Sequence, residues 1–192
     1  MSVHKLTVVP SKILRAKSTD VVLDRKLTTF VDTLGETLVK HENPKGVGLS
    51  APQIGKNWNV FVTLLPPELR EEALPQDLRT FINPKIIGVS NEMTFGEGRE
   101  DPILEGCLSI PDIYGPVPRH FWVEMEYDVI TSDGFRKRQE KFEGFFARVI
   151  QHEYDHLRGV LFTDYSLQHD LPIYEFRKKK MIEIDKSFIK TY

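Results

Sequence analysis

The chain has 192 residues, of which 40% are hydrophobic and 28% are charged, and its formal net charge is −2. This balance is ordinary for a globular protein, and it indicates neither a general DNA or RNA binder nor a membrane protein. The length predicts one domain over residues 1–192. A single cysteine cannot form an intramolecular disulfide, and the N-terminus carries no apolar signal segment. We therefore expect a bacterial-type protein of the cytoplasm.

The first regular element predicted along the chain is a helix that follows an extended arm at residues 1–23. Asp24 has the side chain that an N-cap requires, and the segment 43–46, Asn-Pro-Lys-Gly, ends the helix. Four apolar residues recur at spacings of four, three and four, as one buried helix face requires: Leu27, Val31, Leu34 and Leu38.

The first half of the chain also predicts two strands, at residues 60–65 and 80–89. Pro84 places the second strand at a sheet edge or at a bulge, because proline cannot donate to a strand ladder. Residues 68–79 predict a charged connection that can hold a short surface helix. The polar, glycine-bearing residues 90–104 predict a surface loop.

The second half predicts a hairpin that leads into a helix. Apolar residues alternate over 121–129, Ser132-Asp133-Gly134 is a turn sequence, and residues 135–142 form the returning strand. Residues 160–162 are predicted as a final short strand. Strands on both sides of a central helix, joined by hairpins, predict an α+β fold with antiparallel or mixed β-sheets packed around that helix.

The central helix carries the pattern His-Glu-x-x-His at residues 152–156. Residues four apart lie on one face of a helix, so His152 and His156 can bind the same metal ion. Glu153 lies beside that face and can move protons to and from a water molecule in the fourth coordination position. Gly159 suits a left-handed C-terminal cap of the helix.

The source of the third metal ligand decides the class of site. A metzincin requires a third histidine six residues after the second, where this chain has Phe162. A thermolysin-like site requires a downstream glutamate, for which Glu175 and Glu183 are available. The remaining candidate is the single cysteine, Cys107, and one sulfur with two nitrogens suits both zinc and ferrous iron.

Three motifs resemble those of the peptide deformylase family. They are Glu-Gly-Cys-Leu-Ser at 105–109, Gln-His-Glu-Tyr-Asp-His-Leu-Arg-Gly at 151–159, and Gly-Val-Gly-Leu-Ser-Ala-Pro-Gln at 46–53. They occur in the family's order, and the resemblance covers about residues 5–165. Ser50 stands where alanine is usual in the family.

The resemblance implies a metal-dependent hydrolase that removes the N-formyl group from the initiating methionine of new polypeptides. Cys107, His152 and His156 would hold one divalent ion, with Fe²⁺ native and Zn²⁺, Ni²⁺ or Co²⁺ as replacements. Glu153 would transfer the proton. The Gln53 side-chain amide and the Leu108 backbone N–H would stabilise the developing negative charge on the formyl oxygen.

The substrate methionine needs an apolar pocket near the metal. Phe145 and Val149 precede His152 by one or two turns, and they are candidates for its wall. The motifs at 46–53 and 105–109 add backbone and side-chain candidates around it: Val47, Gly48, Leu49 and Gly106. Glu105 and Asp155 are candidates for holding imidazole N–H groups.

Two other classes remain open on sequence alone, a zinc endopeptidase and a non-catalytic protein with a deformylase-like fold. The tail from about residue 166 departs from the long C-terminal helix usual in the family. Its basic run at 177–180, Arg-Lys-Lys-Lys, predicts a solvated helix face, or a contact with ribosomal RNA. The expected partners are N-formylmethionyl nascent peptides and the ribosome.

Overall fold

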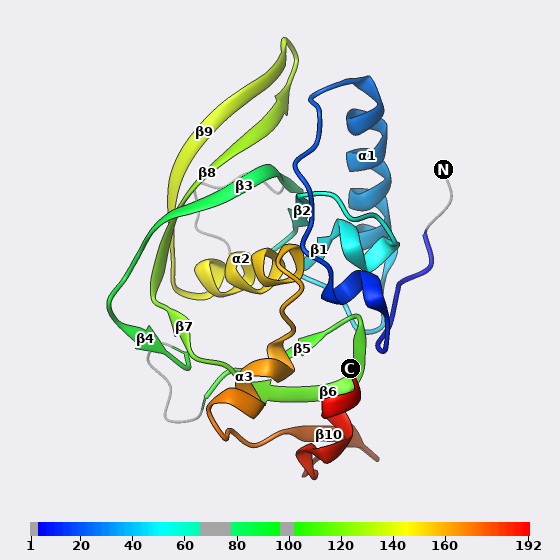
Figure 1. Ribbon diagram of the computed structural model, residues 1–192, viewed down its shortest axis with the longest axis vertical. Coiled ribbons are helices and arrows are strands. Elements are labelled where there is room, and N and C mark those ends of the chain that lie inside the picture. The colour runs from blue at the N-terminus through cyan, green and yellow to red at the C-terminus, as the bar shows by residue number, and fades with distance from the viewer. Residues whose placement is uncertain (1–3, 66–77, 97–101) are drawn as a thin grey trace.

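The computed structural model describes residues 4–65, 78–96 and 102–192. Helix α2 (Gly144–Leu157) lies at the centre of the fold, between a five-stranded sheet and a four-stranded sheet (Figure 1). Among the described residues, each named strand is antiparallel to the strands it pairs with. This arrangement confirms the predicted α+β class with sheets packed around a central helix.

The larger sheet has the order β1-β2-β3-β8-β9 and ends in a long hairpin (Figure 1). Its strands are β1 (Gly48–Ser50), β2 (Val60–Thr63), β3 (Arg79–Val89), β8 (Trp122–Thr131) and β9 (Gly134–Glu143). The strands predicted at 60–65, 80–89, 121–129 and 135–142 are therefore present. Pro84 lies where the register between β3 and β8 shifts, and β3 is an inner strand. Of the two predicted alternatives, a sheet edge or a bulge, the bulge is therefore correct, because it removes the need for an N–H donor at Pro84.

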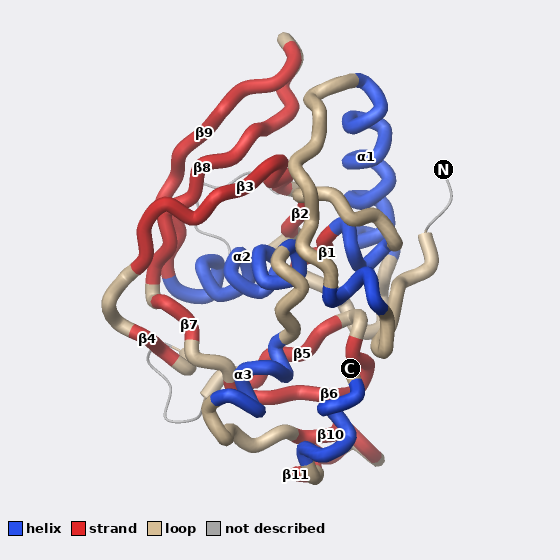
Figure 2. Tube along the Cα trace, in the orientation of Figure 1, coloured by secondary structure: helices blue, strands red, loops and turns tan. Residues whose placement is uncertain are grey.

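The second sheet has the order β11-β10-β6-β5, and a separate two-stranded ladder joins β4 to β7. These strands are β4 (Met93–Thr94), β5 (Leu104–Cys107), β6 (Ile110–Pro116), β7 (Arg119–His120), β10 (Tyr174–Arg177) and β11 (Lys180–Glu183). Figure 2 places this sheet on the side of α2 opposite the long hairpin.

Helix α1 (Arg25–Lys40) begins where the sequence predicts. The Asp24 carboxylate accepts a hydrogen bond of 2.9 Å from the Leu27 backbone N–H, which confirms the N-cap. The four apolar residues of the predicted stripe are buried, and they pack with residues of β1 and β2 in one core cluster.

The apolar face of helix α2 fixes its orientation, and Gly159 fixes its C-terminal end. Ile150 and Leu157 are buried with residues of β3, β8 and β9, and Phe146 packs against the same cluster. Gly159 has φ of +73°, and its N–H donates to the His156 carbonyl at 3.2 Å, so the left-handed end is confirmed. The opposite face of the helix is thereby turned toward β5.

Two sequence-based predictions in the C-terminal part are wrong. Residues 160–162 do not form a strand, because helix α3 (Phe162–Gln168) begins there. The Asp164 carboxylate accepts from the Leu161 backbone N–H at 2.9 Å and so starts a helix that the short apolar run did not reveal. The basic run is not a helix face but the turn of the β10–β11 hairpin, where Lys178 and Lys179 have positive φ. A short helix, η4 (Lys186–Thr191), follows the hairpin.

Other local predictions need smaller corrections. The extended arm contains one short helix, η1 (Lys12–Arg15). The predicted loop at 90–104, of which 97–101 lie outside the described residues, contains β4 and the first residue of β5, since pairing with β7 orders Met93 and Thr94 within a mostly polar segment. The connection predicted at 68–79 lies outside the described residues up to residue 77. Among the helices that the structure describes, we find none with the length and apolar character needed to cross a membrane.

The Asp24 cap gives a test of this part of the fold. Replacing Asp24 with alanine removes the acceptor for the Leu27 N–H and should lower the free energy of unfolding by about 1 kcal/mol. Asp24→Asn keeps an acceptor oxygen and should lower it by only a few tenths of that value. Urea denaturation of the three proteins measures the difference. Equal stability of the alanine variant and the parent would contradict the assigned role of Asp24.

Candidate metal centre and active site

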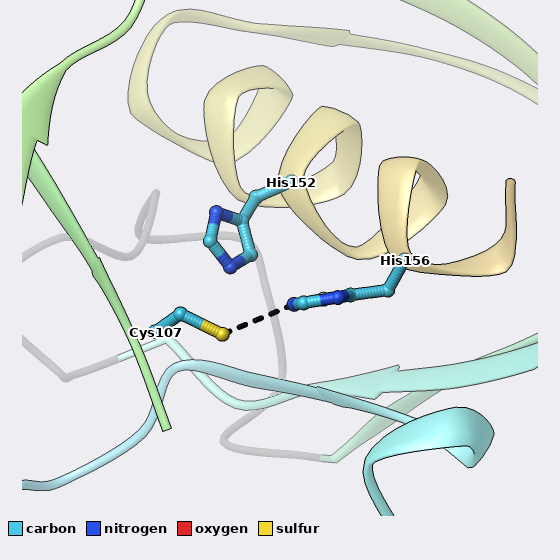
Figure 3. A group of neighbouring side chains, drawn as sticks. All are labelled: Cys107, His152 and His156. Atoms are coloured by element: carbon cyan, nitrogen blue, oxygen red, sulfur yellow. Dashed lines mark hydrogen bonds between the residues drawn. The ribbon is translucent and has the colours of Figure 1, made fainter. Parts of the chain in front are cut away.

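Three potential metal ligands meet between α2 and the end of β5. One ring nitrogen from each of His152 and His156 and the sulfur of Cys107 all lie within 4.8 Å of one another. Figure 3 shows the two imidazoles projecting from successive turns of α2 toward the sulfur, with His156 Nε2 at 3.2 Å from Cys107 Sγ. Glu175 and Glu183, the other candidate ligands from the sequence, lie on the C-terminal hairpin strands β10 and β11.

The turn between β5 and β6 aims the cysteine. The register between these strands shifts after Gly106, and Cys107 pairs with Ile110 across a two-residue turn. The Ser109 backbone N–H donates to Cys107 Sγ at 3.4 Å. The Gln53 side-chain amide donates to the same sulfur at 3.5 Å. Two donors therefore converge on an atom that is suited to bind a cation as a thiolate.

The two imidazoles have different electrostatic environments. Burial, the neighbouring His152 and Arg119 all lower the pKa of His156, which leaves this ring neutral with a free lone pair. Burial also acts to lower the pKa of His152, but hydrogen bonds with Cys107 and Glu105 outweigh it and raise that pKa. The sulfur of Cys107 and the carboxylate of Glu105 thus favour a positive charge at His152. A divalent cation can supply such a charge, so the site fits a metal ion.

A buried carboxylate fixes the ring of His152. Glu105 Oε2 accepts from His152 Nδ1 at 3.0 Å, which leaves His152 Nε2 toward Cys107. Burial acts to raise the pKa of Glu105, but Arg119 and His152 outweigh it, so the pKa is lowered and the carboxylate is ionised. Arg119 binds it through two N–H groups, at 3.0 and 2.8 Å.

Asp155 contacts this network from the other side of Arg119. It accepts from the Arg119 guanidinium and, at 3.0 Å, from the Tyr165 hydroxyl. The two carboxylates predicted to hold the imidazoles, Glu105 and Asp155, therefore both bind Arg119. Of these two, only Glu105 is hydrogen-bonded to a histidine ring among the described residues. Arg119 and Tyr165 were not predicted, because nothing in their local sequence indicates contact with the site.

Glu153 lies buried next to the metal ligands. Burial raises its pKa to about 7, although His152 acts in the opposite direction. Its Oε2 atom has no hydrogen-bond partner among the described residues. The carboxylate packs on Gly48, where an added Cβ would lie 2.7 Å from Glu153 Cδ, so only glycine fits beside it.

Gln53 is held so that its amide nitrogen faces the cysteine. Its Oε1 accepts from the Ser50 backbone N–H at 2.8 Å and from the Ser50 hydroxyl at 2.9 Å. Serine in place of the family's usual alanine therefore adds a hydrogen bond that orients the amide. The N-terminal arm supports this loop, since the Thr7 N–H donates to the Gln53 carbonyl at 2.8 Å.

A cavity of about 440 Å³ opens over these residues. Most of the residues predicted to contact the substrate line it, together with two metal ligands and both proposed catalytic side chains: Val47, Gly48, Gly106, Phe145, Val149, Cys107, His152, Gln53 and Glu153. Leu108 lines it as well. Leu49 does not, because its side chain is buried in the core cluster beside α1. Arg148 also lines the cavity.

Comparison with known sequences identifies the family. The sequence model described as polypeptide deformylase matches residues 3–170. A peptide deformylase of Rhizobium meliloti is 36% identical over 181 residues, which cover 93% of this chain and 94% of that protein. The peptide deformylase of Roseiflexus castenholzii is 44% identical over 126 residues, which cover 62% of this chain and 63% of the relative.

Solved structures agree with the sequence match. A class I type b peptide deformylase from Acinetobacter baumannii has a TM-score of 0.72 and 30% identity, over 86% of this chain and 99% of that one. The peptide deformylase from Thermotoga maritima has a TM-score of 0.69 at the same identity, over 86% and 98%. Enzymes of this family are metal-dependent hydrolases that remove the N-formyl group from new polypeptides. The sequence match, the fold and the cluster of one cysteine and two histidines together show that this chain belongs to the polypeptide deformylase family.

Proposed function

We propose that this chain hydrolyses the formamide bond of N-formylmethionyl peptides, releasing formate and a free α-amine. The observation that carries the proposal is the cluster of Cys107, His152 and His156 beside Glu153, whose Oε2 has no hydrogen-bond partner among the described residues. Cys107, His152 and Glu153 line one cavity. The bacterial relatives and the nature of the substrate, a nascent peptide, support the cytoplasm as the place of the reaction.

Cys107, His152 and His156 would hold one divalent ion, and we propose Fe²⁺ as the native one. Zn²⁺, Ni²⁺ and Co²⁺ fit the same sulfur and nitrogen donors. When bound, such an ion supplies Lewis-acid polarisation of a carbonyl and lowers the pKa of water. Three protein ligands leave a coordination position for substrate or water, as a catalytic site requires.

Glu153 is the proposed proton carrier. Its carboxylate takes a proton from the attacking water as the new C–O bond forms. It then delivers that proton to the nitrogen of the leaving amine, so that the formyl C–N bond breaks. A buried carboxylate with a raised pKa suits both steps, because a group whose pKa lies near the working pH can both accept and donate a proton.

Gln53 and Leu108 are the proposed donors to the formyl oxygen. The Gln53 Nε2 already faces the cluster, and its orientation is set by Ser50 before any substrate arrives. The Leu108 backbone N–H follows directly after the cysteine. Donors fixed in advance at a developing negative charge lower the barrier because they need no reorganisation during the reaction.

The methionine side chain would enter the apolar part of the cavity. Phe145 and Val149 lie on α2 before His152, and Val47 lines the same cavity. Glu153 packs so closely on Gly48 that little free volume remains there. This crowding supports selection of a formyl group over an acetyl group, which carries one more methyl.

The role of Glu153 can be tested with Glu153→Gln, which keeps the size of the side chain and removes its charge. We expect kcat to fall by about 10²- to 10⁴-fold, since the proton has no other carrier, while metal content is unchanged. Formate release from formyl-Met-Ala-Ser by anaerobically purified protein is the assay. Glu183→Gln, in an exposed strand, is the control and should leave the rate unchanged. Retention of more than a tenth of the parent rate by Glu153→Gln would reject the role.

Metal removal tests the cofactor. A chelator should abolish formate release, and Fe²⁺ added without oxygen should restore it. On exposure to air, the iron-loaded protein should lose activity faster than the Ni²⁺-loaded protein, because ferrous iron beside a thiolate is readily oxidised. Activity that survives complete removal of metal would contradict the proposed centre, and equal decay of both forms would contradict iron as the basis of oxygen sensitivity.

We also propose that the β10–β11 hairpin contacts the ribosome. Its turn is exposed and basic, from Arg177 to Lys180, and such a surface can neutralise RNA phosphates. Lys178→Glu combined with Lys179→Glu should reduce co-sedimentation with ribosomes at low salt. Lys137→Glu with Lys141→Glu makes the same charge change on β9 and should have a smaller effect. Unaltered co-sedimentation of the hairpin variant would reject the contact.

A further inference from the structure

Arg148 is a buried cation beside the metal centre that the reaction described above does not use. It lies on α2 four residues before His152, and its side chain is 4% exposed. Its Nη1 donates to Glu105 Oε1 at 2.8 Å and to the Val117 carbonyl at 2.7 Å. Its Nη2 donates to the Thr94 carbonyl at 2.7 Å. None of these contacts reaches a metal ligand directly.

Its partner Glu105 is the residue that orients His152. The two oxygens of this carboxylate accept four hydrogen bonds from three side chains. Oε1 accepts from Arg119 and Arg148, while Oε2 accepts from Arg119 and His152. The carboxylate therefore has little freedom to rotate, and neither does the imidazole that it holds.

The two arginines hold Glu105 relative to different parts of the fold. Arg119 is on β7, so its two bonds fix the carboxylate relative to the strands. Arg148 is on the helix that carries both histidines, so its bond fixes Glu105 relative to α2. Its two carbonyl contacts tie the same helix to β4 and to the segment between β6 and β7.

The balance of buried charge leads to the same conclusion. Two buried arginines, Arg119 and Arg148, form ion pairs with Glu105, and Arg119 also pairs with Asp155. Removing Arg148 would leave the buried Glu105 carboxylate with one ion-pair partner fewer. Such a loss is costly, and the carboxylate would shift in response. His152 Nδ1 would then lose a fixed acceptor.

We propose that Arg148 is a positioning residue for the metal centre, which acts by fixing Glu105 and thereby aiming His152 Nε2 at the bound ion. This inference rests on the metal site of the proposed function. It assigns the metal affinity of the chain in part to a side chain that does not touch the ion. Partners of ligating histidines commonly change metal affinity 10- to 100-fold when they are mutated.

The test compares zinc affinity in matched variants without any substrate. Arg148→Met keeps most of the length but removes the charge and the donors, and Arg148→Lys keeps the charge. Arg79→Met is the control, because Arg79 is also partly buried and ion-paired, with Glu140, but does not contact Glu105. Competition with a chromophoric chelator gives the zinc dissociation constant, and the visible spectrum of the Co²⁺ form reports ligand geometry.

We expect Arg148→Met to bind zinc about 10- to 100-fold more weakly than the parent and to have an altered Co²⁺ spectrum. Arg148→Lys should recover most of the affinity, and Arg79→Met should bind like the parent even if it melts at a lower temperature. An Arg148→Met affinity within twofold of the parent, an equal loss in Arg79→Met, or no recovery in Arg148→Lys would overturn the proposal.

Two further points keep the test decisive. If Arg148→Met does not fold, Arg148→Gln carries the same expectation, because it lacks the charge but can still donate to a carbonyl. Because affinity is measured without substrate, failure of the parent to release formate would leave this result standing. Failure of the parent to bind zinc at all would overturn the metal centre itself.

Discussion

The carboxylate of Glu105 accepts hydrogen bonds from Arg119, Arg148 and His152, and it thereby joins β5, β7 and α2 at one buried point. An ionised carboxylate in the interior is stable only while its partners are in place, because removing one partner from such a group typically costs about 3 to 5 kcal/mol. These three elements therefore have to assemble together. The residues that stabilise the packing here also orient a metal ligand, so stability and site geometry depend on the same contacts.

The two faces of α2 have different roles, one in packing the core and one in presenting the histidines. Phe146, Ile150 and Leu157 pack in or against the core beneath the five-stranded sheet, and this fixes the rotation of the helix about its axis. Because side chains four apart share a face, that rotation presents His152 and His156 together to the end of β5. A helix held less firmly would let the imidazoles move relative to Cys107, which belongs to the other sheet.

The loop that carries Gln53 is the third component of the site, and it is tied to the others through the N-terminal arm. Thr7 donates to the Gln53 carbonyl, and Val9 donates to the Ser109 carbonyl two residues after the cysteine. The arm therefore runs between the glutamine loop and the cysteine turn and holds both. The cavity wall is thus built from segments that are widely separated in the sequence, and the geometry of the site depends on all of them.

Sequence alone determined the parts of this protein that depend on local spacing. The helix periodicity, the Asp24 cap, the Ser132-Asp133-Gly134 hairpin and the two histidines one turn apart all follow from short-range stereochemistry. Tertiary structure decided whatever requires distant segments to meet. That Arg119 and Arg148 share Glu105 could not be predicted, because no local pattern encodes a contact across 14 or 43 residues. The C-terminal hairpin also escaped prediction, since an isolated two-stranded hairpin is marginally stable and this one joins a sheet through the pairing of β10 with β6.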